Sequence, residues 1–442
     1  MITARLYQRI AHRDISFLLK FLRETQFWRR ERIREYQFSK LKRLLDHACL
    51  HVPYYQKLFA QIGATTKDIK NFEDFKKIPI LTKDTIRQNF NSLIATNISK
   101  QELIANSTGG STGKPLHFFQ DRQYELWADA ARIRGWYNLA GCEYGDTCAV
   151  LWGAMHEVKE DFSFCERLRD ILKYGEVWLN AFNLSDERKL EFLKYCRLIR
   201  PKLLRGYFTG IKDMAIFLGE HKLSFPKVNG VILGAETVDD HSKSYIESIF
   251  RAPSYNTYGG RELSLIAMEC PQKDGLHEVS ENNYVEFEEI HLAGYNNAGN
   301  LIITNLNNYA MPFIRYRVGD IGIPSSVESC GCGRGLPLIH KVIGRTTEVF
   351  GFYDGTRIAG EMFIHLMKDF QLKEYQFVQV SDWKVILRYK KADGVSWELK
   401  KRIKDRYRAY LPERVELSFE EVGGFEKTGT GKFRFVLSDS AS

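Results

Sequence analysis

The sequence predicts an α/β protein with two domains. The large N-terminal domain is expected to contain βαβ units and a strand-rich sublayer, and the small C-terminal domain to be α+β. Three observations support this: strand-like and helix-like stretches alternate over residues 121–260, a strand-rich pattern follows over 284–304, and a separate mixed pattern covers 360–442. A chain of 442 residues is also too long for one simple core.

The first 75 residues or so are predicted to be helical, and a further helix is expected to begin at Thr82. A long helical pattern occupies residues 121–140. The stretches predicted to be buried strands are DTCAVLW (146–152), KLLRGY (202–207) and VNGVILGAE (228–236). Helical stretches follow each of them, at ERKLEFLKYCRLIR (187–200), IKDMAIFLGEH (211–221) and HSKSYIESIF (241–250). Because parallel strands need a long crossover, usually a helix, this alternation indicates a parallel sheet.

The order of stretches changes after the segment GRTTEVF, where a helix, two strands, a helix and a strand are predicted. We therefore predict a boundary after residue 344, with residues 1–344 forming the large domain and residues 345–442 the small one. A set of five elements is enough for a small domain with its own core.

The charge and composition exclude several classes of protein. The net charge is +9, and much of it lies in WRRERIREYQFSKLKRLL (28–45), where apolar residues recur at helical spacing. A solvated basic helix face explains this better than a nucleic-acid site, because no zinc finger or helix-turn-helix pattern accompanies it. No apolar run is long enough to span a membrane and no secretory signal is visible, so we expect a cytoplasmic protein whose eight cysteines form no disulfides.

The stretch NSTGGSTGKPL (106–116) is too polar to pack in a core. Glycines allow a ligand to approach the backbone, and hydroxyl and N–H groups suit phosphate oxygens. It is not a Walker A loop, because Thr108 stands where that motif needs glycine and Pro115 where it needs a hydroxyl. Either it is a different phosphate loop or it is a flexible surface turn.

Four further stretches carry polar and glycine residues in unusual combinations: NTYGGRE (256–262), FIRYRVGD (313–320), IGRTTE (343–348) and KTGTGKFR (427–434). Each is weak alone. Together they supply what a site needs when a carboxylate attacks the α-phosphate of ATP: a metal ligand, a flat side chain for adenine, an acid for the ribose diol and a cation for the transition state. The residues that fit these roles are Glu262, Tyr258, Asp320 and Lys432.

These stretches, together with HVPYYQKLF (51–59) and IPILTKDTIR (78–87), resemble in their order the adenylate-forming superfamily of acyl-CoA synthetases, luciferases and peptide-synthetase adenylation domains. Within it, the chain is most similar to the phenylacetate–CoA ligase branch and its CapK-like relatives from capsule-polysaccharide clusters. The resemblance extends from about residue 45 to residue 435.

The resemblance implies ATP-dependent, AMP-forming activation of a carboxylic acid with Mg²⁺, followed by transfer to CoA or to an amine or hydroxyl of a sugar. It also implies that the large domain binds ATP and the acid, and that the small domain is a mobile lid carrying the catalytic lysine. The nucleotide site is then assigned to Ser107, Thr108, Gly109, Gly110, Ser111, Thr112, Gly113, Lys114, Gly234, Ala235, Glu236, Tyr258, Gly259, Arg261, Asp320 and Arg345, and the catalytic roles to Glu262, which would hold Mg²⁺, and Lys432.

Two positions depart from the superfamily pattern. Arg261 stands where threonine often precedes the metal-binding glutamate, and its planar guanidinium suits phosphate or a substrate carboxylate. Thr347 stands at the hinge position, which is usually aspartate or lysine.

Cysteine and histidine residues bracket the strand-rich segment. Four of them, Cys270, His277, Cys330 and Cys332, suit a closed tetrahedral Zn²⁺ site. The alternative is a pair of buried cysteines beside a surface Cys-Gly-Cys turn.

Other interpretations stay open at this point. The chain could be a nucleotide-binding regulator that has lost catalysis, or a basic nucleic-acid-binding protein, although Glu262 and Lys432 favour an enzyme. Five further residues could reach an acyl pocket: Lys83, Trp152, His156, Arg205 and Tyr207. For each of them an ordinary role is the better prediction, as a surface lysine, a core tryptophan and three ordinary loop residues.

Overall fold

The computed structural model describes residues 15–108, 115–153, 170–172, 175–181, 184–367, 370, 372, 375–390, 395–425 and 436–438. The chain divides into two compact units. Unit 1 comprises Met1–Glu286, Ile302–Arg317 and Ser325–His340, and unit 2 comprises Phe287–Leu301, Val318–Pro324 and Lys341–Ser442. The boundary predicted after residue 344 stays a prediction.

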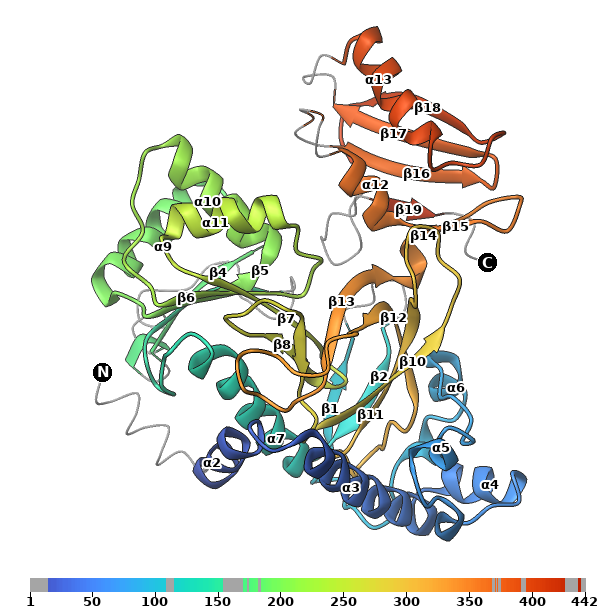
Figure 1. Ribbon diagram of the computed structural model, residues 1–442. Helices are drawn as coiled ribbons and strands as arrows, with labels where there is room; N and C mark the ends of the chain where they lie inside the picture. The colour runs from blue at the N-terminus through green and yellow to red at the C-terminus, as the bar shows by residue number, and fades with distance from the viewer. Residues whose placement is uncertain are drawn as a thin grey trace. The chain divides into compact units, whose positions relative to one another are not determined.

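An α/β architecture with a large sheet and a smaller C-terminal part is present, as predicted (Figure 1). The strand order in the large sheet is β10-β11-β12-β13-β9-β8-β7-β6-β5-β3-β4. Its parallel strands are β3 (Cys148–Trp152), β4 (Glu176–Asn180), β5 (Leu203–Tyr207), β6 (Gly230–Gly234) and β7 (Ser254–Gly260). Antiparallel pairing continues through β8 (Ser264–Glu269) and β9 (Leu276–Glu278). The chain passes between the units within β10 (Asn283–Glu289), β11 (Gly299–Asn305), β12 (Tyr316–Pro324) and β13 (Leu338–Arg345).

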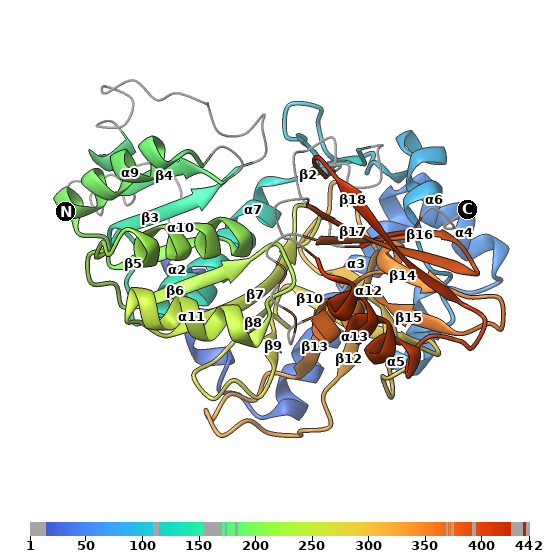
Figure 2. The same ribbon diagram turned by 90° about the horizontal axis from the view of Figure 1, so that it is seen from above.

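Helices cover both faces of the parallel strands in unit 1. On one face lie α9 (Asp186–Ile199), α10 (Phe208–Glu220) and α11 (Asp240–Phe250), and on the other lie α2 (Ser16–Thr25) and α7 (Arg122–Arg132), which continues into a π-helical turn at Ile133–Asn138 (Figures 1 and 2). Sheets buried on both faces have nearly continuous apolar strands. The strand VILG satisfies this rule, because Val231, Ile232 and Leu233 are all 2% exposed or less.

The helices that precede the sheet in sequence are α3 (Arg30–His51), α4 (Pro53–Gln61), α5 (Phe72–Phe75) and α6 (Lys83–Gln88). The prediction that Thr82 begins a helix is confirmed, because its side chain accepts a hydrogen bond from the backbone N–H of Thr85 and so caps α6. The basic segment 28–45 lies mainly in α3, where Ile33, Leu41 and Leu44 are buried as its helical spacing predicts.

Unit 2 contains a second sheet of strand order β18-β17-β16-β19. Its strands are β16 (Tyr375–Ser381), β17 (Lys384–Lys390), β18 (Glu416–Val422) and β19 (Val436–Ser438). Helices α12 (Gly360–Leu366) and α13 (Trp397–Arg408) share one apolar core with these strands. The small hairpin of β14 (Val349–Gly351) and β15 (Arg357–Ala359) contributes to the same core. The helix and strand order predicted for residues 360–422 is thus confirmed. Phe363, Phe377 and Tyr407 are central in this core.

Candidate functional site

The carboxyl ends of the parallel strands in unit 1 meet at one edge of the sheet. The chain first leaves β3 for β4 and then returns to the other side of β3 as β5, so the winding reverses between β3 and β5. Open α/β sheets bind ligands outside the carboxyl ends of their strands at such a switch point. Trp152 ends β3 and Tyr207 ends β5, and their ring centroids are 4.6 Å apart.

The turn after β6 contains three predicted nucleotide-site residues. A Cβ at Gly234 would lie 3.0 Å from Thr257 Oγ1, and Ala235 has a positive φ of 66°. The Glu236 carboxylate accepts hydrogen bonds from the backbone N–H of Thr209, at 2.7 Å, and from its hydroxyl. Because Thr209 lies in the first turn of α10, this carboxylate also satisfies the helix N-terminus. Their contact with adenine stays a prediction.

The hairpin between β7 and β8 carries the next group of predicted residues. Its two strands shift register between Tyr258 and Gly259, and Tyr258 is half-buried. A side chain at Gly259 is excluded, because its Cβ would lie 2.4 Å from the carbonyl oxygen of Ser264. Such a bulge bends the strand and so changes the direction of the segment that leads to Glu262. Bulges of this kind are frequent beside active sites.

Glu262 lies at the tip of this hairpin and is half-buried. The hydroxyl of Tyr316, which is itself fully buried, donates to Glu262 Oε1 at 3.2 Å. A half-buried carboxylate with one oxygen held by the phenol of Tyr316 suits a Mg²⁺ ion that takes its remaining ligands from phosphates and water. The residues present therefore fit the metal that the sequence predicted.

A second hairpin, formed by β1 (Ile104–Ser107) and β2 (His117–Gln120), supports the glycine-rich stretch. The N–H of Thr108 donates to the carbonyl of Leu116 at 2.9 Å, and the N–H of Leu116 donates to Thr108 Oγ1 at 3.0 Å. The segment between them, Gly109–Lys114, lies outside the described residues. The glycine-rich stretch is thus the connection between two paired strands.

Arg261 joins the two hairpins. Its Nη1 donates to the carbonyl oxygen of Ser107 at 3.0 Å, and Gln120 Nε2 donates to the carbonyl of Arg261 at 2.9 Å. Burial lowers the pKa of the guanidinium and the neighbouring Glu262 carboxylate opposes that effect, so the group keeps its charge. The stretches around Ser107 and Glu262, separated by more than 150 residues in sequence, therefore lie side by side.

Two residues that hold this arrangement were missed from the sequence. Gln120 also accepts a hydrogen bond from Asn106 at 3.1 Å, and Tyr316 supports Glu262. Gln120 is the last residue of strand β2, and no pattern in the sequence distinguishes it. Tyr316 lies within the quoted stretch RYRVGD, and its position four residues before Asp320 was the available signal.

Asp320 and Arg345 belong to unit 2. Arg345 Nε lies 3.9 Å from Asp320 Oδ1, and the Thr346 hydroxyl donates to the carbonyl of Gly319 at 3.2 Å. The Thr347 hydroxyl is buried and has no hydrogen-bond partner among the described residues of the chain. Lys432 and the rest of the stretch 427–434 lie outside those residues.

Aromatic side chains surround a buried ion pair near the switch point. Arg205 Nη2 lies 3.0 Å from Glu176 Oε1, and the Arg205 guanidinium lies over the rings of Trp136 and Trp178, at 4.9 and 5.3 Å from their centroids. Burial opposes the charge of Arg205, but Glu176 raises its pKa above the usual value. Arg205 therefore lies in strand β5 and not at the ordinary loop position expected for it, and its buried Nε has no hydrogen-bond partner among the described residues.

Of the other residues considered for the acyl pocket, Lys83 opens helix α6 and His156 lies outside the described residues. Among the described residues, no helix has both the length and the hydropathy that crossing a membrane requires.

The four predicted zinc ligands lie together in unit 1. Their ligand atoms are all within 4.8 Å of one another, and His277 and Cys270 are 0% and 1% exposed. Cys270 Sγ lies 3.5 Å from Cys330 Sγ, and Cys332 Sγ lies 3.3 Å from His277 Nε2. Every cysteine among the described residues is a free thiol.

No protein-family model matches the chain. Protein CapK of Staphylococcus aureus is 24% identical to it over 422 residues, which are 92% of this chain and 89% of that protein. The phenylacetate-coenzyme A ligase of Pseudomonas putida is 25% identical over 333 residues, 72% of this chain and 71% of that ligase. A crystal structure of 2-hydroxyisobutyryl-CoA ligase in the postadenylation state, in complex with 2-HIB-AMP, has the same fold, with a TM-score of 0.70, 18% identity, and coverage of 92% of this chain and 90% of that one.

Proposed function

The chain belongs to the adenylate-forming ligase superfamily and is an AMP-forming ligase, and from this premise we propose that it activates a carboxylic acid with ATP through an acyl-adenylate. The observation that carries this proposal is the junction of two hairpins in unit 1, where the base of the glycine-rich stretch and the Arg261–Glu262 pair are joined by hydrogen bonds. The base of the proposed phosphate-binding loop then lies next to the proposed metal ligand, which is an arrangement that suits a triphosphate.

We assign the triphosphate to this junction. Ser107 and Thr108 lead into the loop that would supply backbone N–H and hydroxyl donors to phosphate oxygens. Glu262 would hold Mg²⁺, which when bound neutralises charge on the transferring phosphate. Arg261 donates to the carbonyl of Ser107 and so holds the start of the loop beside Glu262.

In the proposed reaction, a carboxylate oxygen of the acid attacks the α-phosphorus of ATP. The new bond is the acyl–phosphate bond of the adenylate, and the bond that breaks joins the α-phosphorus to the bridging oxygen of the departing pyrophosphate. Negative charge spreads over the α-phosphate oxygens in the transition state, and we assign the cation that stabilises it to Lys432. The lysine acts by charge and accepts no proton in this step.

The nucleoside is assigned to the residues that the resemblance indicated. Asp320 would accept hydrogen bonds from both ribose hydroxyls, with Arg345 beside it, and Tyr258 and the turn Gly234–Glu236 would contact adenine. The acyl group is assigned to the carboxyl ends of β3 and β5, where aromatic rings line the switch point. An acid with an apolar or planar body suits these surroundings.

The acceptor of the acyl group is proposed to be CoA, with an amine or hydroxyl of a sugar as the second candidate. Similarity to a phenylacetate-coenzyme A ligase favours CoA. The similarity to CapK, which extends over a larger share of the chain, favours the second candidate and with it a role in surface-polysaccharide modification. Both routes share the adenylate and differ only in the nucleophile that attacks its carbonyl carbon.

The proposal is tested by measuring pyrophosphate release from ATP and Mg²⁺ with a library of aliphatic and aromatic acids, each with and without CoA. We expect release that depends on the acid, and CoA-dependent loss of the adenylate if CoA is the acceptor. A chain that binds ATP yet releases no pyrophosphate with any acid would support a regulator that has lost catalysis. Retention on DNA or RNA that falls steeply with salt, without ATP binding, would support the nucleic-acid alternative.

Asp320→Ala is expected to weaken ATP binding by about 10²–10⁴-fold, because the two hydrogen bonds from the ribose hydroxyls to a charged group contribute about 1.5–3 kcal/mol each. ATP and its 2′,3′-dideoxy analogue should then bind the variant almost equally, whereas the wild-type chain should prefer ATP. Titration calorimetry measures both affinities. Asp382→Ala, which removes an exposed carboxylate elsewhere in unit 2, is the matched control. An unchanged preference for ATP in the Asp320 variant would contradict the ribose assignment.

A further inference from the structure

We infer that Cys270, His277, Cys330 and Cys332 bind one structural Zn²⁺ ion in unit 1. The inference is independent of the proposed reaction. Three thiolates and one imidazole are a standard donor set for a closed tetrahedral zinc site, in which no position is left for a substrate. The sequence pointed to these residue types, and the structure adds their geometry.

The separations between donor atoms agree with a tetrahedral ion. Zinc–sulfur bonds of about 2.3 Å at tetrahedral angles place two sulfurs about 3.8 Å apart, and a sulfur and a nitrogen somewhat closer. The Sγ atoms of Cys270 and Cys330 are 3.5 Å apart, and Cys332 Sγ and His277 Nε2 are 3.3 Å apart. All the donor atoms lie within 4.8 Å of one another, so one ion can reach each of them without movement of the backbone.

The histidine ring is held in the orientation that a metal ligand needs. Nδ1 lies 3.2 Å from the carbonyl oxygen of Leu336, which can only accept, so the proton is on Nδ1 and the lone pair is on Nε2. Nε2 is the atom that lies next to the cysteine sulfur. An outer hydrogen bond that fixes the tautomer in this way is typical of zinc-bound histidine.

The charge of the site is also compensated. Three thiolates and Zn²⁺ would carry a net charge of −1, and the cationic Arg334 follows Cys332 by two residues. Arg334 is itself held by Gln26, whose Oε1 accepts from Arg334 Nε at 2.9 Å. The nearest carboxylate identified at the site, Asp274, is exposed, and its Oδ2 lies 3.6 Å from Cys330 Sγ, at the edge of the cluster.

The position of the site in the fold indicates a structural role. Cys270 directly follows β8, His277 lies in β9, and the other two cysteines lie in the loop that leads to β13. The ion would thus connect segments 60 residues apart, and closing such a loop stabilises the folded state. Strand β8 alone spans about 20 Å, which separates the cluster from Glu262 at the other end of that strand.

The test uses the full-length chain, prepared without chelator from zinc-containing medium and analysed by inductively coupled plasma mass spectrometry. We expect about one zinc per chain. The double variant Cys330→Ser/Cys332→Ser should retain less than a tenth of it, and His277→Ala should also lose zinc, whereas His277→Cys should retain it. Asp274→Asn and Cys49→Ser are matched controls that should keep full occupancy. Removal of zinc should lower the unfolding temperature of unit 1 by about 5–10 °C.

A wild-type content below about 0.1 zinc per chain, a comparable amount of iron instead of zinc, or loss of zinc from Asp274→Asn would overturn the assignment. So would an intramolecular disulfide between Cys270 and Cys330, detected by peptide mass mapping without reductant. If the double variant does not fold, a thiol-modifying reagent is added to the wild-type chain, and zinc release is followed with a metal-sensitive dye. Release of one zinc for three modified cysteines is the expected result, and modification of these cysteines without release of zinc refutes the site.

Discussion

Glu262→Gln is expected to lower the rate of acid-dependent pyrophosphate release by about 10²–10³-fold. The substitution keeps the shape of the side chain and the oxygen that accepts the hydrogen bond from Tyr316, but it removes the negative charge that is proposed to bind the metal. The loss should be mainly in kcat, because the charge on the transferring phosphate increases in the transition state. Raising Mg²⁺ should recover part of the rate, since a neutral amide oxygen is a weaker ligand for this ion.

Two other variants make this expectation specific. Tyr316→Phe removes only the hydrogen bond to the carboxylate, at 3.2 Å, and should reduce the rate by less than about tenfold. Glu220→Gln is the control. Glu220 is exposed at the carboxyl end of α10, and because that helix returns along the sheet after β5, its last residue lies toward the amino ends of the strands. Wild-type rates in Glu262→Gln, measured with saturating acid, would show that Glu262 does not hold the catalytic metal.

The parallel part of the sheet could be predicted from the sequence because its strands are buried on both faces. Runs such as CAVLW and GVILG are apolar at every position, and helical patterns separate them. The strands β12 and β13 were not predicted, because glycine and charged residues interrupt their alternation. The strand β8, SLIAME, was not predicted either, although its residues up to Met268 are buried. Gly319, within β12, has a positive φ of 93°, which is unusual in a strand.

The functional stretches could be found from the sequence, but the bonds that join them could not. Arg261 contacts the carbonyl of Ser107 and Gln120 contacts the carbonyl of Arg261, and a bond to a backbone carbonyl requires no particular residue type in return. Such contacts therefore leave no paired signal in a single sequence. The cysteine and histidine residues differ in this respect, because a metal ligand is restricted to few residue types and their proximity could be proposed from the residues alone.

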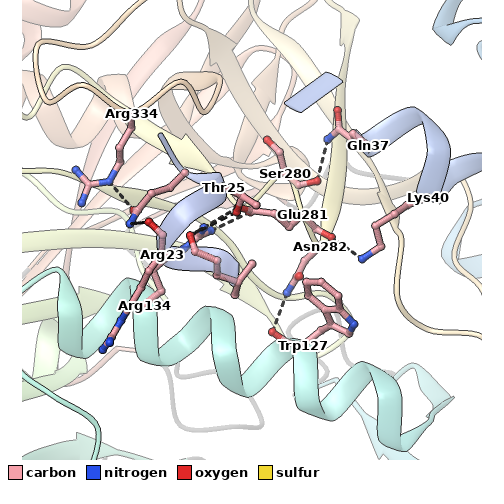
Figure 3. A network of polar contacts seen from close by, with 12 residues as sticks. Arg23, Thr25, Gln37, Lys40, Trp127, Arg134, Ser280, Glu281, Asn282 and Arg334 are labelled. Atoms are coloured by element: carbon pink, nitrogen blue, oxygen red, sulfur yellow. Dashed lines mark hydrogen bonds and ion pairs between the residues drawn. The ribbon is translucent and has the colours of Figure 1, made fainter. Parts of the chain in front are cut away.

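A buried ionic network in unit 1 was also absent from the sequence-based expectations. Arg134 lies within the long helical pattern of residues 121–140 and Glu281 within the polar run Ser280–Asn283, and neither position differs in appearance from a solvated one. Both side chains are buried, at 1% and 2% exposure. Lys40 donates to the carbonyl of Glu281 at 2.8 Å, which connects α3 to the same network (Figure 3). Two residues that lie 147 positions apart in the sequence cannot be recognised as an ion pair unless the fold is known.

Arg134→Met is expected to destabilise unit 1 by about 3–5 kcal/mol, because it leaves the Glu281 carboxylate buried without its counter-charge. In the wild-type chain the carboxylate accepts from Arg134 Nη1 at 2.7 Å and from Nη2 at 3.0 Å, and the Thr25 hydroxyl donates to it at 2.5 Å (Figure 3). The double variant Arg134→Met/Glu281→Gln should recover part of the loss, since a neutral amide costs less to bury than a charge. Glu143→Gln is the control: it breaks the exposed pair with Arg23, whose atoms are 2.6 Å apart, and should cost less than about 1 kcal/mol.

The dependence of stability on pH should change sign in the same variant. Burial alone would raise the pKa of Glu281, but Arg134 and Thr25 together hold it below its usual value of 4.5. The pair therefore stabilises the wild-type chain above that pH, and its contribution is lost as the pH falls through the lowered pKa. Without Arg134, burial dominates and the pKa rises above 4.5, so the folded variant binds more protons than the unfolded chain and loses stability as the pH rises. Urea unfolding of Arg134→Met between pH 5 and 8, followed by tryptophan fluorescence, measures the slope of stability against pH. If the stability of this variant depended on pH no more than that of Glu143→Gln, Glu281 would not require its arginine.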